Sequence, residues 1–358
     1  MDNSNSPICC HPMECKTALH KVGGTYPYEL DLNVYRGCSH GCKYCFALYS
    51  HKYLKSEQKS IQEDGADASY FNHIYAKTNI AFQLEKELSR LGRSRMRTRP
   101  PTQTQTRIQT QKSLLACKTI NFGSVSDSYQ PAEAEFSIMP DIWKLMIRYK
   151  NPVVISTKSD LILRDLDLID ELSKVASVHV ASTITATDVS IQKKIEPGCV
   201  STARRFEMLR KMKKTDATIG VHMMPVMPLL TDTDENLEAI FSKTKEIGAD
   251  YILGAALFLR GETKKSYLEF IQNDFPQLSN RMRDLYKTGH LDKKYKTELY
   301  EKLDALTAKY DLSNNYRRVD KEGRKRDEEK RRVEGWTHTE KPMRIEKKER
   351  QSTLLQFC

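Results

Sequence analysis

Short apolar, β-branched runs alternate with amphipathic stretches from residue 118 to about residue 260. The stretches between the runs carry apolar residues at spacings of three and four, which is the period of an amphipathic helix. Strands that alternate with helices indicate an α/β fold with a parallel sheet. The predicted strands are Leu30–Tyr35, Thr119–Gly123, Pro152–Thr157, Val178–Ile184, Ala217–Met223 and Tyr251–Leu257, and the predicted helices are Ile138–Tyr149, Arg164–Lys174, Ala203–Lys213 and Asp234–Ile247.

Six such β/α units predict a barrel, complete or partial, in which chemistry gathers where the strands end at their C-terminal side. Beyond residue 262 the pattern becomes helical, and we predict short helices over Met282–Lys287 and Lys293–Tyr310 that serve packing. The expected organisation is an N-terminal tail at 1–25, a core barrel at 26–270, a C-terminal helical extension at 271–316 and a disordered charged tail at 317–358.

The composition is that of an ordinary globular protein, with 39% apolar and 29% charged residues. The longest apolar run, Ile252–Leu259, is far shorter than the roughly twenty residues of a membrane span. The first residues are polar and lack the apolar stretch of a signal peptide. We therefore expect a cytoplasmic protein without a membrane partner.

The net charge of +11 is concentrated in two segments. Residues 90–112 carry six Arg and one Lys without an acid, giving +7, and residues 317–350 carry fourteen Lys or Arg against nine acids, giving +5, which leaves −1 for the rest. We expect any contact with DNA or RNA phosphates to come from these two segments. The low-complexity run within 91–116 is expected to be a mobile basic insertion, or alternatively a solvated linker without a role.

Cys38, Cys42 and Cys45 follow the first predicted strand in a tight C-x3-C-x2-C loop, in which Gly37 and Gly41 allow the backbone to wrap. Three thiolates can ligate three irons of a [4Fe–4S] cluster and leave the fourth iron open. An open iron can chelate the amino and carboxylate groups of S-adenosylmethionine (SAM), which is the arrangement needed to cleave it reductively. The alternatives are free thiols or a zinc site, for which the loop itself offers only His40 as a fourth ligand.

The same loop resembles a known family. A C-x3-C-x2-C motif with an aromatic residue before the third cysteine, here Tyr44, is the hallmark of radical SAM enzymes. Further motifs resemble the branch related to spore photoproduct lyase, a DNA-repair enzyme: G-S-V-S-D-S-Y-Q-P-A-E, S-T-K-S-D-L-I-L-R-D and I-E-P-G-C-V-S-T-A-R-R-F. The resemblance runs from about Tyr26 to Leu268 and implies a partial (β/α)6 barrel with the cluster and SAM near its C-terminal mouth.

The resemblance also implies which residues contact the cofactor. Besides Tyr44, these are Ser124, Ser126 and Asp127 for the methionine group of SAM, Lys158 for its carboxylate, Ser182 and Thr183 for its ribose, and Arg204 or Arg205 for a second carboxylate contact.

The hydrogen donor of the family has no counterpart at its usual place. Spore photoproduct lyases carry a cysteine near the end of the second strand that returns a hydrogen atom to the product, whereas this stretch reads Asn121-Phe122-Gly123-Ser124. Cys117 lies several residues earlier, at the entry of the strand. Tyr129, Tyr35, Cys199 or another group is then the candidate donor, unless the reaction returns no hydrogen atom.

Cys9, Cys10 and Cys15 form a C-C-x4-C group with His11 nearby. The group lacks the paired C-x2-C spacing of common metal sites. It is therefore either an auxiliary metal site or a set of incidental thiols in a disordered tail.

The leading prediction for function is an enzyme that cleaves SAM to methionine and a 5′-deoxyadenosyl radical, which takes hydrogen from a nucleic-acid substrate in a lyase-like, DNA-repair setting. A flavodoxin or ferredoxin is the expected electron donor. The alternatives are radical modification of a protein or a small molecule, and a nucleic-acid binding module in which the cluster is structural. Formation of 5′-deoxyadenosine distinguishes the enzyme from the binding module.

The last eight residues, 351–358, read Q-S-T-L-L-Q-F-C. Gln351, Leu354 and Phe357 resemble the box with which archaeal and eukaryotic DNA-processing proteins bind the sliding clamp, proliferating cell nuclear antigen. A spacing of three would place Leu354 and Phe357 on one face of a helical turn. Cys358 stands where the box usually has a second aromatic residue, so weaker anchoring is expected. The alternative is an apolar tail that packs back on the barrel.

Overall fold

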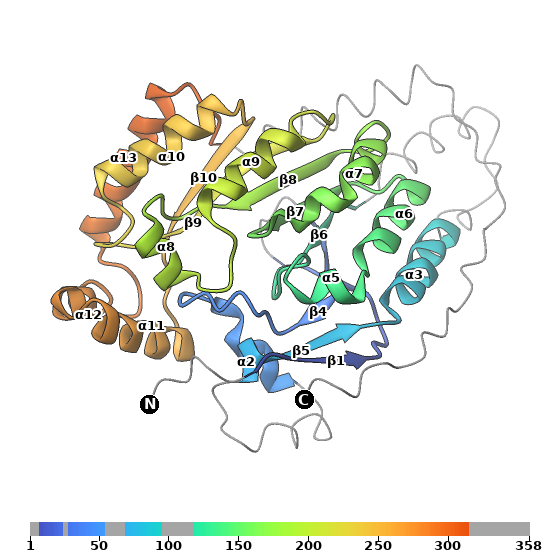
Figure 1. Cartoon of the computed structure of the whole chain (residues 1–358), viewed down its shortest axis with the longest axis horizontal. Coiled ribbons are helices and arrows are strands. Elements are labelled where there is room, and N and C mark those ends of the chain that lie inside the picture. Colours follow the sequence, from blue (N-terminus) through green and yellow to red (C-terminus); the bar gives the residue numbers. More distant parts are fainter. Residues whose placement is uncertain (1–6, 24–27, 54–68, 95–117, 315–358) are drawn as a thin grey trace.

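A seven-stranded sheet forms the centre of the computed structural model, which describes residues 7–23, 28–53, 69–94 and 118–314 (Figure 1). All neighbouring strands are parallel except the last pair, which is antiparallel. From one edge to the other, the strands are β10 (Tyr251–Ala256), β9 (Thr218–Val226), β8 (Val178–Thr183), β7 (Val153–Thr157), β6 (Ile120–Phe122), β3 (Leu30–Leu32) and β2 (Leu19–Lys21).

The six parallel strands from β3 to β10 confirm the predicted α/β fold. Strands β10 and β2 are the two edges, so the sheet stays open over the described residues and forms a partial barrel. The first predicted strand is shorter than expected, because the chain leaves the main sheet after Leu32. Residues Tyr35–Arg36 then form β4 in a second sheet.

The second sheet has three strands and brings N-terminal residues into the fold. Strand β1 (Cys9–Met13) is parallel to β5 (His73–Lys77), which is antiparallel to β4. Helix α2 (Ser69–Asn72) precedes β5. Residues 1–25 were expected to be a tail, but this stretch contributes β1 and β2, with Ala18 fully buried between them.

The N-terminal cysteines do not converge on one point. Cys9 and Cys10 are neighbours in β1, so their side chains point to opposite faces of the sheet. The Cys15 thiol donates to the Asn79 side-chain oxygen at 3.3 Å. An auxiliary metal site built from all three thiols is therefore inconsistent with this strand geometry.

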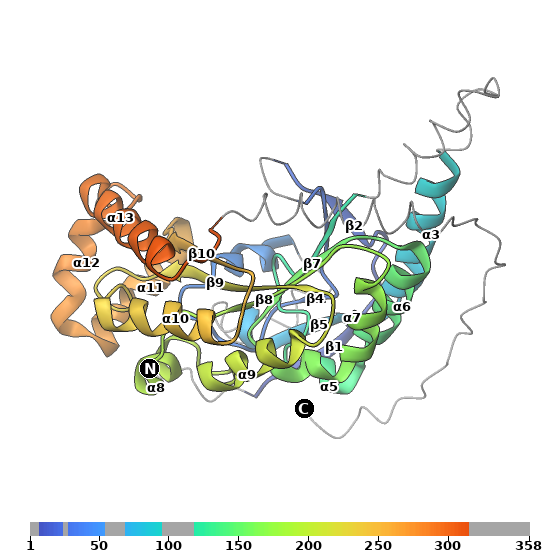
Figure 2. The ribbon, with the colours of Figure 1, turned by 90° about the horizontal axis from the view of Figure 1, so that it is seen from above.

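Helices cover the outer face of the main sheet (Figure 2). The four predicted helices are confirmed to within one residue, except that Arg164–Lys174 starts inside a 3-10 turn. The Thr233 hydroxyl accepts a hydrogen bond from the Asn236 backbone N–H and so caps the N-terminus of the helix Asp234–Glu246. The helices are α3 (Ile80–Ser94), α5 (Ala132–Phe136), α6 (Met139–Tyr149), α7 (Leu166–Ser173) after the 3-10 turn η4 (Asp160–Asp165), α8 (Val189–Ile195), α9 (Thr202–Met212) and α10 (Asp234–Glu246).

The basic insertion begins inside a helix, because α3 continues to Ser94. Residues 95–117, which contain the rest of the insertion and Cys117, lie outside the described residues, as do the charged tail and the terminal box. Over the described residues, no helix combines the length and the apolar character that a membrane crossing requires.

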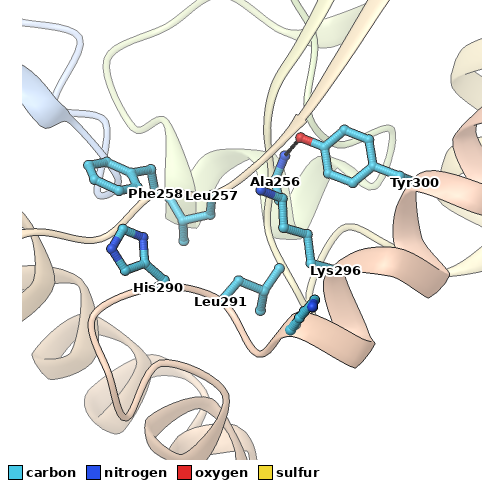
Figure 3. A pocket seen from close by; sticks show the side chains of 8 residues that line it. Ala256, Leu257, Phe258, His290, Leu291, Lys296 and Tyr300 are labelled. Carbon is cyan, nitrogen blue, oxygen red and sulfur yellow. Dashed lines mark hydrogen bonds between the residues drawn. The ribbon is translucent and has the colours of Figure 1, made fainter.

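The C-terminal extension is helical, but its first helix begins at residue 261 rather than 271. It consists of α11 (Gly261–Asp274), the 3-10 turn η5 (Pro276–Leu278), α12 (Ser279–Leu285) and α13 (Lys293–Lys309). Helix α13 packs on β10 so closely that a Cβ atom at Gly254 would come within 2.9 Å of the Leu303 side chain. A pocket lies between the end of β10 and the start of α13 (Figure 3).

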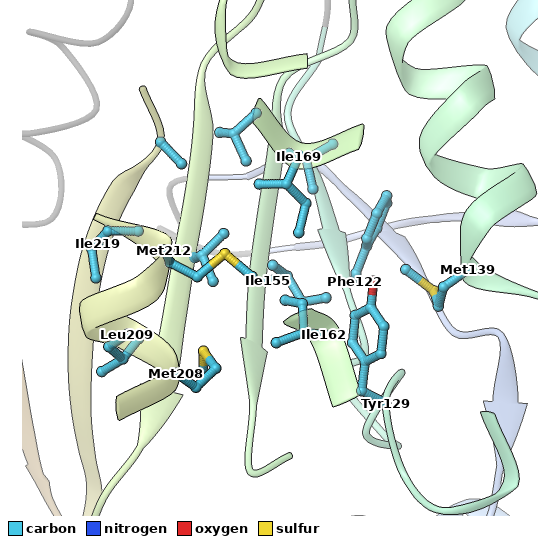
Figure 4. Packing of buried hydrophobic residues seen from close by; sticks show 14 of the residues in the cluster. Phe122, Tyr129, Met139, Ile155, Ile162, Ile169, Met208, Leu209, Met212 and Ile219 are labelled. Atoms are coloured by element: carbon cyan, nitrogen blue, oxygen red, sulfur yellow. The ribbon is translucent and has the colours of Figure 1, made fainter. Parts of the chain in front are cut away.

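The apolar core lies between the sheet and its helices. Phe122, Ile155 and Ile219 project from β6, β7 and β9 toward Met139 on α6 and Met212 on α9 (Figure 4). Because side chains alternate along a strand, the residues between these core positions face the interior of the barrel. That interior is polar and includes Asp31, Asn33, Asn121, Lys158, His179 and His222.

Candidate functional site

The three cysteines of the motif lie together on the loop after β4. Cys38 and Cys42 are buried and Cys45 is half-buried. Gly37 and Gly41 take φ angles of 82° and 64°, a region that favours glycine, so the loop can wrap as its sequence predicted. Burial and the nearby Cys42 and Cys38 raise the pKa of Cys45 to about 12, as expected for thiols gathered in a small volume.

The segment after β6 holds the cysteine loop from one side. The Ser126 hydroxyl donates to the Gly37 carbonyl at 2.9 Å, and the Gln130 side chain donates to the same carbonyl at 3.0 Å. The Gln130 oxygen accepts from the Ser39 backbone N–H at 2.9 Å. Ser126 was predicted to contact SAM, and this geometry instead uses its hydroxyl to fix the loop.

Asp127 is also committed to the scaffold. Its carboxylate accepts from the Thr157 hydroxyl at 2.7 Å and the Lys158 backbone N–H at 2.8 Å, and it lies 3.4 Å from His40 Nδ1. Burial alone would lower the pKa of His40, but Cys38 and Asp127 outweigh it and raise that pKa to about 10. Burial would likewise raise the pKa of Asp127, but His40 and Lys158 hold it well below its usual range. The cysteine loop is thus tied to β7 through a charged pair.

A second loop, 196–199, packs on the opposite side of the cysteine loop. The Gly198 backbone N–H donates to the His40 carbonyl at 3.0 Å, and the Lys43 N–H donates to the Ile195 carbonyl at 2.9 Å. A Cβ atom at Gly198 would lie 2.3 Å from the Ser39 carbonyl oxygen, so only glycine permits this approach. The contact places Cys199 Sγ 4.0 Å from Cys42 Sγ. Cys199, one of the predicted donor candidates, therefore lies beside the cysteine motif.

A buried ion pair anchors the second loop. The Arg205 guanidinium lies 2.6 Å from the Glu196 carboxylate, and both side chains are 0% exposed. Arg205 also donates to the carbonyls of Val200 and Thr183, each at 2.9 Å. The Tyr44 hydroxyl donates to the same Glu196 carboxylate, which links the motif aromatic to the pair.

The two adjacent arginines therefore differ sharply. Arg205 is fully engaged inside the protein, whereas Arg204 is 63% exposed and forms a surface pair with Asp160 at 2.7 Å. Neither guanidinium is left available as the predicted second carboxylate contact. Glu196 was not singled out by the sequence analysis, although it stands in the motif I-E-P-G-C that carried part of the resemblance.

Lys158 lies beside the cysteine loop. It follows β7, and its Nζ lies 5.9 Å from the centre of the Tyr44 ring. Burial would lower the pKa of Lys158, but Cys42 and Glu196 outweigh it and keep that pKa raised. In the described part of the chain no carboxylate forms an ion pair with this ammonium group, so it is free to pair with an anionic ligand.

His222 on β9 faces the interior, although it was not among the predicted site residues. It is paired in register with Thr183 on β8, and Lys158 is one residue beyond the Thr157–Ser182 pair, so all three share one level of the interior. Its Nε2 lies 3.2 Å from the Tyr251 hydroxyl. Burial and the charge of Lys158 lower the pKa of His222 to about 3, so the ring is neutral.

The remaining predicted residues divide between the interior and the core. Ser124 lies at the mouth, within hydrogen-bond reach of the Asp31 carboxylate. Ser182 and Thr183 point to opposite faces of β8, and the Ser182 hydroxyl donates to the Thr157 carbonyl at 2.8 Å. Of these two, Thr183 therefore faces the interior.

The two tyrosine candidates for a hydrogen donor lie in the core. The Tyr129 hydroxyl donates to Asp165 at 2.8 Å and accepts from Trp143 at 2.6 Å, inside the packed cluster of Figure 4. The Tyr35 hydroxyl donates to Glu133 at 2.5 Å. Both side chains are fully buried, which removes them from the interior surface that a substrate would reach.

The residues present fit an iron–sulfur cluster with bound SAM. Three soft thiol donors lie on one loop, and His40, the fourth ligand that a zinc site would need, is engaged with Asp127. The unpaired ammonium of Lys158 stands beside them. No group of three or more His, Cys, Asp or Glu in the described residues is arranged to hold one metal ion, so the fit rests on the chemistry of these donors.

The chain is similar in sequence to several uncharacterized proteins. Uncharacterized proteins from Mycobacterium tuberculosis and Mycobacterium bovis are 31% identical over 313 residues, which cover 87% of this chain and 83% of theirs. An uncharacterized protein from Methanocaldococcus jannaschii is 25% identical over 250 residues, covering 69% of this chain and 76% of that protein.

Solved structures give the same fold. A mutant spore photoproduct lyase with bound AdoMet and dinucleoside spore photoproduct matches with a TM-score of 0.52 and 14% identity, covering 84% of this chain and 79% of that one. The spore photoproduct lyase complexed with dinucleoside spore photoproduct matches with the same TM-score. The family model described as the radical SAM superfamily matches residues 32–241, and this chain belongs to that superfamily.

Proposed function

We propose that this chain holds a [4Fe–4S] cluster on Cys38, Cys42 and Cys45, cleaves SAM reductively and acts on nucleic acid. The observation that carries the proposal is the unpaired ammonium of Lys158 beside the three-cysteine loop. When bound, the cluster supplies the electron for cleavage of SAM. The chain's own residues bind and orient the cofactor and keep water from the reacting atoms.

Residues of the site described above bind the cofactor, orient it and exclude water. The Lys158 ammonium pairs with the SAM carboxylate. Thr183 and neutral His222, on the same level of the interior, offer a hydroxyl and an imidazole to the rest of the cofactor or to the substrate. The Glu196–Arg205 pair and Tyr44 seal the side of the loop that faces the apolar cluster around Leu257.

Nucleic acid is supported as substrate by two facts. The structurally similar lyase binds a dinucleoside photoproduct, and the positive charge of this chain is concentrated in segments 90–112 and 317–350. A lyase-like reaction on a DNA lesion is the form of this chemistry that the similarity favours. Cys199, rather than Tyr129, is the side chain beside the cysteine loop that could return a hydrogen atom.

The substrate class is tested by following a label. DNA and RNA oligonucleotides carrying deuterium in their sugars and bases are incubated with reconstituted enzyme and SAM. We expect deuterium from one of them in 5′-deoxyadenosine, detected by its mass. Abundant 5′-deoxyadenosine without deuterium from either polymer would contradict a nucleic-acid substrate and favour a protein or small molecule.

Lys158→Ala is expected to weaken SAM binding by about tenfold to a hundredfold, because the variant lacks one charge-assisted hydrogen bond of roughly 1.5–3 kcal/mol. Iron content stays unchanged, since no cysteine is touched. Equilibrium dialysis with labelled SAM measures the affinity. Lys43→Ala removes the same charge from an exposed position on the cysteine loop and serves as the control. Equal affinities in the two variants would remove Lys158 from the site.

The basic insertion is expected to act through phosphate contacts. Deleting residues 95–113, which leaves α3 intact, lowers nucleic-acid affinity and flattens its dependence on salt, while SAM cleavage without substrate is unchanged. Fluorescence anisotropy at several salt concentrations measures both effects. An unchanged slope would favour a linker without a role.

Partner binding through the terminal box is a separate proposal. Gln351, Leu354 and Phe357 would recruit the sliding clamp at the end of the charged tail, and a flavodoxin or ferredoxin would donate the electron. A peptide of residues 345–358 titrated against the clamp from the same organism tests the first. Binding that survives Leu354→Ala combined with Phe357→Ala would contradict it.

A further inference from the structure

The pocket at the end of β10 has a distinctive lining. It encloses about 300 Å³ and lies where the barrel mouth meets the helical extension (Figure 3). Its floor includes Leu257, and its walls carry three rings and two ammonium groups, from Phe258, His290, Tyr300, Lys293 and Lys296. The lining contains no carboxylate, so its charge is positive.

Phe258 presents an unusually exposed ring. Its side chain is 51% exposed, and its ring centre lies 5.7 Å from that of His290 at a tilt of 48°. The backbone beneath it is fixed, because the Leu257 N–H donates to the Val226 carbonyl at 2.9 Å and the Tyr286 hydroxyl donates to the Leu257 carbonyl at 2.7 Å. An exposed aromatic ring on a rigid support is a surface on which a flat, apolar group can stack.

The two lysines of the pocket are available to an anion. Lys296 Nζ lies 5.7 Å from the centre of the Tyr300 ring. Over the described residues, neither Lys293 nor Lys296 has a carboxylate partner, whereas the neighbouring Lys294 lies 4.0 Å from Glu298. The first turn of α13 contains no acid, and the carboxylate of the residue before it, Asp292, accepts a hydrogen bond from the Tyr295 backbone N–H at 2.9 Å.

The segment that carries the pocket contacts the cysteine loop through an apolar cluster and a hydrogen bond. Leu257 belongs to the same buried apolar cluster as Cys42 and Tyr44. Five residues after Phe258, the Thr263 hydroxyl donates to the Cys45 carbonyl at 3.1 Å. A ligand on Phe258 would therefore lie at the edge of the mouth. The helical extension, predicted to serve packing, also forms a wall of this pocket.

We propose that this pocket binds one nucleotide of a single-stranded or locally unpaired nucleic acid. The base stacks on Phe258 beside His290, and the adjoining phosphates lie against Lys293 and Lys296. Stacking on a protein ring needs the free face of a base, which a closed duplex does not offer. The pocket volume of about 300 Å³ lies at the lower end of the range for small-molecule sites and is suitable for one nucleotide. That the bound strand is also the substrate rests on the proposed function.

The test uses the full chain and a fluorescent, short single-stranded oligothymidylate, with anisotropy measured over a range of salt concentrations. Phe258→Ala is expected to weaken binding about tenfold without changing the salt slope, since stacking is not ionic. Phe258→Trp retains the affinity. Lys293→Ala combined with Lys296→Ala lowers the salt slope by about 1.4, because each phosphate that a lysine neutralises on a single strand contributes roughly 0.7 to that slope.

Matched controls remove the same groups elsewhere. Phe82→Ala deletes a ring that is 64% exposed on α3, and Lys294→Ala deletes a charge on the same helix as the pocket lysines but outside the pocket. Phe82→Ala is expected to change the affinity for the oligonucleotide by no more than about twofold. Lys294→Ala is expected to lower that affinity only by the small amount that the loss of one non-specific surface charge causes. Equal losses in the pocket variants and in these controls, or an unchanged affinity of Phe258→Ala, would overturn the proposal.

Failure of this proposal and failure of the proposed function give different results. If the variants cleave SAM normally, label passes from nucleic acid to 5′-deoxyadenosine and Phe258→Ala binds the strand like the unaltered protein, the pocket assignment alone is wrong. If the pocket variants lose binding as expected but no label is transferred from nucleic acid, the pocket assignment stands and the substrate proposal is wrong.

Discussion

Alanine in place of Cys38, Cys42 or Cys45 is expected to abolish the visible absorption of the cluster and all cleavage of SAM. In the proposed site each thiolate would bind a different iron, and Cys38, Cys42 and Cys45 are the only sulfur-containing residues of the loop at 37–46. The measurement is anaerobic reconstitution with iron and sulfide, followed by the absorption spectrum, the iron content per chain and an assay for 5′-deoxyadenosine.

Cys15→Ala is the matched control for this loss. Cys15 is half-buried, and its thiol bonds to Asn79 rather than to the loop, so the variant should bind iron like the unaltered chain. A triple variant at Cys38, Cys42 and Cys45 that still assembled a full cluster, for example on the N-terminal cysteines, would contradict the assignment.

Arg205→Ala is expected to lower the free energy of unfolding by about 3–5 kcal/mol. The change removes one partner of an ion pair in which both side chains are 0% exposed, so the Glu196 carboxylate is left charged and buried without its guanidinium. The carbonyls of Val200 and Thr183 lose their donors as well. Urea unfolding followed by circular dichroism measures the loss.

Arg204→Ala is the control, since it removes the same charge one residue away. That side chain is 63% exposed and its pair with Asp160 is a surface pair, so the expected loss is at most about 1 kcal/mol. If Arg205→Ala does not fold, Arg205→Lys keeps the charge but loses the fork of donors and should fall between the two. Equal stabilities of the Arg204→Ala and Arg205→Ala variants would contradict the account of the buried pair.

The central fold could be predicted because its elements are strongly periodic. The strands from β6 to β10 are apolar runs, and α6, α9 and α10 carry apolar residues at helical spacing. The N-terminal strands were missed for a physical reason. Strand β1 reads Cys-Cys-His-Pro-Met, which has no alternating pattern, and it is held by pairing with His73–Lys77, more than sixty residues away.

The candidate site was predictable where its residues are close in sequence. The spacing of Cys38, Cys42 and Cys45 indicates a shared ligand directly, and Lys158 follows a clear strand. The packing of loop 196–199 on the cysteine loop joins residues far apart in the chain. Cys42 and Cys199, for example, are 157 positions apart, and no local pattern reveals their contact.

For two pairs of adjacent residues, the sequence alone does not reveal which side chain faces solvent, core or interior. Arg204 and Arg205 look equivalent in a motif, yet the helix turns one to solvent and the other into the protein. Ser182 and Thr183 are likewise separated by the alternation of a strand. Ser126 and Asp127 were predicted to contact SAM, and in the structure their side chains bond to the cysteine loop and to the end of β7.

The proposed activity is cleavage of SAM at a site formed by the three-cysteine loop and Lys158. It is tested most directly by reconstituting the full chain anaerobically, adding a strong reductant and SAM, and measuring 5′-deoxyadenosine and methionine by mass spectrometry. We predict both products in equal amounts, and their loss in the cysteine variants. A chain that carries a complete cluster, binds SAM and still yields no 5′-deoxyadenosine would contradict the claim and identify the cluster as structural.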